Sequence, residues 1–80
     1  MTITITDIIG KIVMHGSPGY MNQETITKVV FVKHNVEMEF ESGAFTTMGP
    51  DEFEYFLRYE ELNYHEASHG GMSSIVFCDQ

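Results

Sequence analysis

The sequence predicts a small α+β protein, in which one helix packs on a face of an antiparallel sheet of four to five strands. Several segments alternate apolar and polar residues or are rich in β-branched side chains, as half-buried strands are. One segment, which begins at Pro50, instead spaces its apolar residues three and four apart, as a helix does. With 80 residues, we expect a single domain that spans residues 1–80.

The first quarter of the chain is expected to be extended and then to enter a long loop. Residues 2–6 alternate Thr and Ile, and residues 8–14 (IIGKIVM) are mostly apolar. Their β-branched content favours strands, although an amphipathic helix over residues 6–14 fits the same pattern. Residues 15–24 (HGSPGYMNQE) are predicted to form the loop, because two glycines and a proline punctuate them.

The middle of the chain is predicted to form a β-hairpin. Residues 25–33 (TITKVVFVK) are the clearest strand, and residues 36–42 return as its partner after a two-residue connection at His34-Asn35. Because successive strand side chains alternate, the apolar residues of the second strand should face one side and its glutamates the other (Val36, Met38 and Phe40 against Glu37, Glu39 and Glu41). Residues 44–48 are predicted to add a short strand.

A helix is predicted over about residues 50–62. Proline suits the first helical position, and Asp51 and Glu52 follow where the helix dipole favours negative charge. Residues 64–69 fit either a continued helix or a strand, and residues 72–79 are predicted to close the sheet. The core is expected to come from apolar residues of all these elements (Ile5, Ile12, Val30, Val32, Met38, Phe40, Phe53, Phe56, Leu57, Ile75 and Phe77).

The charge balance narrows the classes of partner. The chain has twelve acidic residues, four Lys or Arg residues and a net charge of −8. This charge disfavours direct binding to nucleic acid and to anionic membranes. A single cysteine and no secretory signal pattern predict a cytoplasmic protein. A chain this short buries only about 60% of its unfolded surface, so a partner protein or a homo-oligomer is expected to add stability.

Residues 65–69 read HEASH, which resembles the zinc-peptidase motif H-E-x-x-H. In that motif His65 and His69 would hold zinc on one helical face, and Glu66 would activate a metal-bound water. The context disfavours this chemistry, because two glycines follow His69 at once and no further His comes after them. We therefore expect no enzyme activity, no catalytic residue and no cofactor, with His65 and His69 kept as a minor metal-binding alternative.

The acidic residues themselves are the candidate binding surface. Glu37, Glu39 and Glu41 would lie about 6.6 Å apart along a strand, close to the roughly 7 Å between successive phosphates of one nucleic-acid strand. Such a row would compete with nucleic acid for a basic groove on a partner protein. The helix acids would extend it if the two elements lie side by side (Asp51, Glu54, Glu60 and Glu61). The alternative is that the acids only keep the protein soluble.

A second hypothesis is an oligomer that binds a small anionic ligand, such as a metabolite or a signalling nucleotide. It rests on the predicted loop at residues 15–24, with Tyr20 near its tip, and on the few bases of the chain, Lys28, Lys33 and Arg58. An anionic ligand needs these bases to lie close together.

The chain also resembles a known group of proteins. It is short and acidic, has one cysteine, and places a β-hairpin (VVFVKHNVEMEFES) before an acidic helix (PDEFEYFLRYEEL). In these respects it resembles the small acidic proteins that bacteriophages encode against host defences, anti-CRISPR proteins among them. That resemblance implies a non-enzymatic inhibitor of a nucleic-acid-handling complex in the host cytoplasm. The group is structurally mixed, so it assigns no site residues to this chain.

Overall fold

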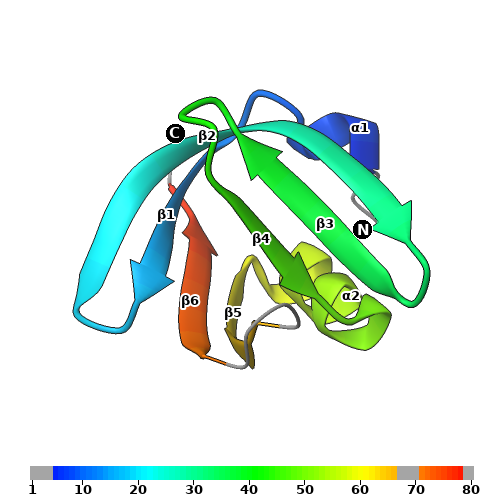
Figure 1. Ribbon diagram of the computed structural model, residues 1–80. Helices are drawn as coiled ribbons and strands as arrows, with labels where there is room; N and C mark the ends of the chain where they lie inside the picture. Colours follow the sequence, from blue (N-terminus) through cyan, green and yellow to red (C-terminus); the bar gives the residue numbers. More distant parts are fainter. Residues whose placement is uncertain (1–4, 67–70, 79–80) are drawn as a thin grey trace.

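The computed structural model describes residues 5–66 and 71–78. Figure 1 shows a strongly bent antiparallel sheet with one helix packed inside the bend. The strands follow the order β4-β3-β2-β1-β6-β5. In chain order the elements are α1 (Ile5–Ile8), β1 (Ile12–Ser17), β2 (Tyr20–Val32), β3 (Asn35–Phe40), β4 (Phe45–Met48), α2 (Pro50–Tyr59), β5 (Glu61–His65) and β6 (Met72–Phe77).

The bend of the sheet is centred on β2, which is 13 residues long. Its first half pairs with β1 and its second half with β3. The register shifts between Ile26 and Lys28, which marks a β-bulge at Thr27. A bulge inserts one residue and bends its strand. As a result Ile26 and Val29, three residues apart, both pack toward the core.

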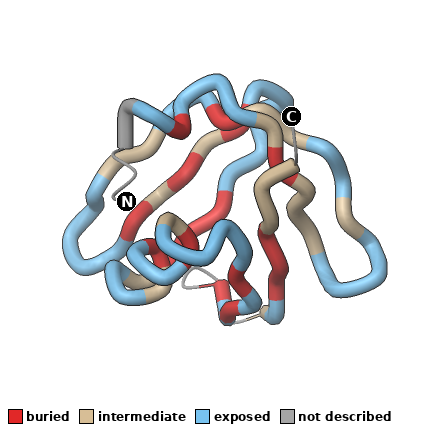
Figure 2. The backbone as a smooth tube through the Cα atoms, turned by 180° about the vertical axis from the view of Figure 1, so that it is seen from behind, coloured by how far each residue is buried: buried red, intermediate tan, exposed pale blue. Residues whose placement is uncertain are grey.

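The core fills the space between the inner face of the bent sheet and α2. Figure 2 shows the buried stretches gathered between the helix and the strands. Phe53 and Phe56 are the buried residues of the helix. The Phe56 ring stacks on Phe77 of β6 with centroids 4.5 Å apart, and Phe53 meets Phe31 of β2 edge-on. The helix therefore joins both halves of the sheet from the inside.

The helix begins as the sequence predicts and ends earlier. The N–H of Gly49 donates to Glu52 Oε1 at 2.8 Å, which caps the first turn. Glu60 adopts a left-handed φ of 65° and ends the helix, so the predicted end near residue 62 is wrong. Leu62 and Tyr64 alternate with exposed neighbours and pair with β6. Burying these two side chains against the core favours strand for residues 61–65.

The N-terminal predictions need larger corrections. Residues 5–8 form a helical turn rather than an extended strand, and residues 1–4 lie outside the described part. The predicted loop at residues 15–24 is wrong, because β1 and β2 form a hairpin with only Pro18-Gly19 between them. Gly19 has a φ of 90°, which fits a type II turn with proline before it.

The second hairpin is shifted by one residue. Its connection is Lys33-His34, not His34-Asn35, and Lys33 takes the left-handed φ of 57°. The predicted apolar face of the second strand is confirmed, since Val36, Met38 and Phe40 are all buried. The sheet has six strands, not four to five, and β5 is the strand that the predicted helix partly covered.

The expected core residues divide into three groups. Met38, Phe40, Phe53, Phe56 and Ile75 are buried, while Leu57 and Phe77 pack against the core at its edge. Ile12 and Val30 are only half-buried, Val32 is exposed, and the Ile5 side chain lies outside the described part. The bulge explains the errors in β2, because it places Val29 against the core and Phe31 on the helix side, where Phe31 stays 62% exposed. The core residues that were not predicted are Ile8, Val13, Ile26, Val36, Met48, Leu62 and Tyr64.

Candidate functional site

Four polar side chains meet on the inner side of the sheet, and we call them the polar cluster: His15 of β1, Thr46 of β4, Tyr64 of β5 and Glu66 just after β5. The Thr46 and Tyr64 hydroxyls lie 2.6 Å apart, and both donate to Glu66 Oε2. Glu66 Oε1 accepts the backbone N–H of Thr47 at 3.1 Å. His15 Nε2 lies 3.1 Å from the Tyr64 hydroxyl and 3.5 Å from Glu66 Oε2.

The polar cluster holds an ionised carboxylate away from solvent. Glu66 is only 4% exposed. Burial raises its pKa, but the hydrogen bonds from Thr46, the Thr47 N–H and Tyr64, together with nearby His15, outweigh burial and leave the pKa below the ordinary 4.5. Burial is also the main reason that the pKa of Tyr64 is raised, and the Glu66 charge raises it further. At neutral pH the cluster therefore contains a charged Glu66 and a neutral Tyr64.

The position of Glu66 shows what the polar cluster does for the fold. β4 and β5 are the two ends of the strand order. Glu66 follows β5, yet its carboxylate binds the backbone and a side chain of β4. It thereby ties the two ends of the bent sheet together and satisfies a backbone N–H that an open edge would expose. Because its carboxylate is used to join the two end strands, we assign the cluster a structural role.

The HEASH segment does not form the arrangement that a zinc peptidase needs. His65 lies in a strand, where it is exposed, and the next residue, Glu66, points the opposite way into the interior. The motif requires these residues on a helix. His69 lies outside the described residues. Within residues 5–66 and 71–78, no group of three or more His, Cys, Asp or Glu is placed to hold a metal ion.

The structure separates the predicted acidic residues into two sets. Glu37 and Glu39 lie on the face of β3 opposite the core, and Glu41 is exposed just after the strand. The helix covers the inner face instead, since Phe53 meets Phe31, which pairs with Val36. The remaining acids lie on this helix or just after it (Asp51, Glu54, Glu60 and Glu61). The strand row and the helix acids therefore do not form one continuous track.

The strand glutamates belong to a mixed apolar and acidic surface, which we call the outer sheet face. It is formed by alternate residues of β2, β3 and β4 that share one side by register: Lys28, Val30, Val32, Glu37, Glu39 and Phe45. Val32 is 47% exposed and Phe45 is 52% exposed. The sequence pattern predicts the outward-facing glutamates of this surface but not Phe45. Phe45 could have been assigned to this face from the sequence, because strand residues alternate and Thr46 and Met48 lie on the other face.

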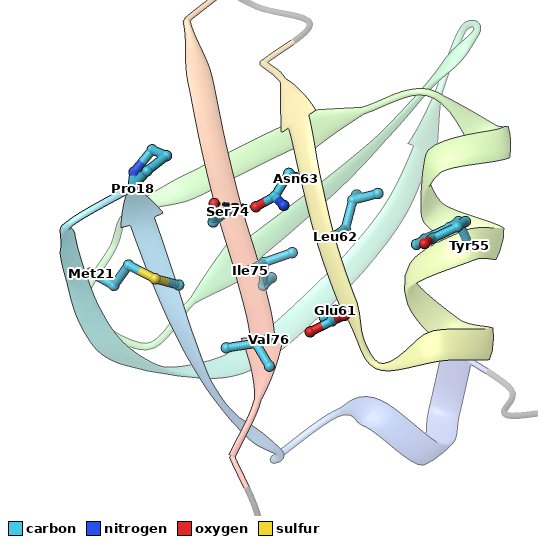
Figure 3. Close-up of a pocket in the computed structure, with 9 residues that line it drawn as sticks. All are labelled: Pro18, Met21, Tyr55, Glu61, Leu62, Asn63, Ser74, Ile75 and Val76. Atoms are coloured by element: carbon cyan, nitrogen blue, oxygen red, sulfur yellow. Dashed lines mark hydrogen bonds between the residues drawn. The ribbon is translucent and has the colours of Figure 1, made fainter.

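A groove lies on the outer side of β1, β6 and β5, and we call it the β5 groove. Its volume is about 390 Å³. Figure 3 shows Pro18 and Met21 at one side, Tyr55 of α2 at the other, and β6 and β5 between them. An adjoining hollow of about 380 Å³ is lined by Asp51, Glu52, Tyr55, Leu62 and Asn63.

The lining of the β5 groove bears on the small-ligand hypothesis. Its residues come from the first hairpin, α2, β5 and β6, so sequence reasoning did not bring them together. Among the described lining residues of the groove and the hollow, there is no lysine or arginine. Neither therefore offers the paired bases that an anionic metabolite or nucleotide would need.

The chain matches no protein-family model, no curated protein and no solved structure. In the part of the chain that the structure describes, neither helix has the length and apolar character to cross a membrane.

Proposed function

We propose that this protein is a non-enzymatic binding protein whose outer sheet face docks on a basic surface of a partner protein. One observation carries the proposal: Val32 and Phe45 are about half exposed beside Glu37 and Glu39, on a sheet face that α2 leaves uncovered. An exposed apolar centre among charged residues is typical of protein interaction sites. Here the apolar residues would supply contact area, and the glutamates would select a positively charged partner.

The charge of the whole chain supports the same kind of partner. At a net charge of −8, the protein is steered toward positive surfaces, which speeds association at low salt. A protein groove that normally binds nucleic acid is positively charged, so it is one such surface. Together with the resemblance to phage anti-defence proteins, this supports an inhibitor that blocks a nucleic-acid-binding surface in the cytoplasm.

The structure provides a matched test, because three acids can be reversed in the strand set and three in the helix set. The partner is first captured from the native host, identified by mass spectrometry and purified. Its affinity is then measured for a strand variant (Glu37→Lys, Glu39→Lys and Glu41→Lys) and a helix variant (Asp51→Lys, Glu54→Lys and Glu60→Lys). Circular dichroism checks that both variants fold.

The two variants have the same net charge, so only the position of the reversal differs. We expect the strand variant to bind roughly 100-fold more weakly, because like charges would face each other in the complex. The helix variant should lose less than about tenfold, mainly through slower association. If the helix variant loses as much affinity as the strand variant, or more, the outer sheet face is not the docking surface.

A further inference from the structure

We infer that the β5 groove is a second docking site, which takes an extended, arginine-containing segment of a partner protein. Its long sides are built by separate elements, the first hairpin and α2, with two strands as the floor (Figure 3). It is therefore an elongated groove rather than an enclosed cavity. This shape fits a stretch of chain better than a compact small molecule. The inference does not depend on the outer sheet face.

The chemistry of the groove favours a basic occupant. Met21 and Val76 offer apolar surface, Glu61 is the charged residue of the lining, and Tyr55 places an aromatic ring at the helix side. The adjoining hollow adds Asp51 and Glu52. Arginine suits such a lining, because its methylene stem lies on apolar surface while its guanidinium pairs with a carboxylate or stacks on an aromatic ring.

Two features fix the backbone and the polar side chains near the groove floor. Gly16 lies opposite Ser74 and Met21 in the sheet, and a Cβ atom there would come within 2.3 Å of the Tyr20 carbonyl oxygen. Only glycine fits at this position, so the backbones of β1 and β2 can lie close together there. Beside it, the Ser74 hydroxyl donates to Asn63 Oδ1 at 2.5 Å. This bond holds the two polar side chains of the floor against each other.

The test is a titration of the ¹⁵N-labelled full chain, followed by two-dimensional NMR. The probe is the synthetic peptide acetyl-Gly-Arg-Leu-Gly-Arg-Gly-amide, and its counterpart carries glutamate in place of both arginines. We expect the arginine peptide to shift the amide signals of Tyr55, Asn63, Ser74 and Val76, with a dissociation constant below about 1 mM. The glutamate peptide should shift none of them.

Two variants of equal charge distinguish specific binding in the groove from non-specific attraction between the basic peptide and the acidic protein. Glu61→Lys should weaken binding of the arginine peptide at least tenfold, while Glu37→Lys on the outer sheet face should change it less than twofold. Equal weakening by both variants, or shifts spread over all acidic residues, would overturn the inference. So would the absence of saturable binding. Because the two variants lie on different surfaces, failure of the groove leaves the test of the outer sheet face intact.

Discussion

Glu66, just after β5, and Glu37, in β3, lie on opposite sides of the sheet, and their carboxylates have different surroundings. Glu66 lies inside, where four polar groups surround its carboxylate. Glu37 lies on the outer sheet face, between Val30 and Thr47 in the register. The first carboxylate holds the ends of the sheet together, and the second is left for solvent or a partner. Whether one of these glutamates stabilises the fold therefore depends on the side of the sheet that it faces.

The largest expected effect is the loss of Glu66. Glu66→Ala removes the buried carboxylate that accepts hydrogen bonds from Thr46, Tyr64 and the Thr47 N–H. We expect the free energy of unfolding to fall by about 3 kcal/mol or more. Glu37→Ala should change it by less than about 0.5 kcal/mol. Urea unfolding measures both, and similar losses would remove the distinction between the two glutamates.

The second expected effect is a loss of stability in acid. The pKa of Glu66 in the folded protein lies below its ordinary value of 4.5, so its ionised form favours folding. This contribution is complete above pH 4.5 and is lost as the pH falls through the lower folded-state pKa. Urea midpoints measured from pH 7 to pH 3 should therefore decline more steeply in the wild type than in Glu66→Gln. Parallel curves would show that Glu66 does not cause the decline.

The third expected effect comes from the hydroxyl of Tyr64. Tyr64→Phe removes a group that lies 2.6 Å from the Thr46 hydroxyl and 3.2 Å from Glu66 Oε2, and should cost about 1–2 kcal/mol of unfolding free energy. The control is Tyr55→Phe, because Tyr55 is half exposed on α2 and its hydroxyl can bond to water. Thermal unfolding compares the two. An equal cost at Tyr55 would mean that burial in the polar cluster adds nothing.

The sequence predicted the parts of the fold that follow strict local patterns. In β3 the apolar and acidic residues alternate without interruption, and the predicted faces are confirmed at Val36, Met38 and Phe40. In β2 the same reasoning was wrong, because a bulge at Thr27 reverses the faces and no glycine or proline marks it. The first hairpin was missed for a related reason. Pro18-Gly19 is a turn of two residues, but the polar residues on both sides of it are typical of a longer loop.

The polar cluster could not be predicted because its members are far apart in the chain. His15 lies 49 residues before Tyr64, and Thr46 lies 20 residues before Glu66. The HEASH pattern is typical of a helix with both histidines on one face. In an extended chain, adjacent side chains point to opposite faces, so His65 is exposed and Glu66 is buried. The choice depended on pairing with β6, which no local pattern in residues 61–66 reveals.

The smallest expected effect is at Glu39, which lies opposite Lys28 in the register of β2 and β3. A double-mutant cycle with Glu39→Gln and Lys28→Met should give a coupling energy of about 0.2–1 kcal/mol, as exposed pairs usually do. Added salt should weaken it, since exposed charges are screened. A parallel cycle with Glu66→Gln and Tyr64→Phe should give a larger coupling that salt barely changes. A Glu39 coupling that is equally strong and insensitive to salt would contradict this expectation. The Glu39 charge would then be neutralised by Lys28 within the protein, and less negative charge on the outer sheet face would remain for a partner.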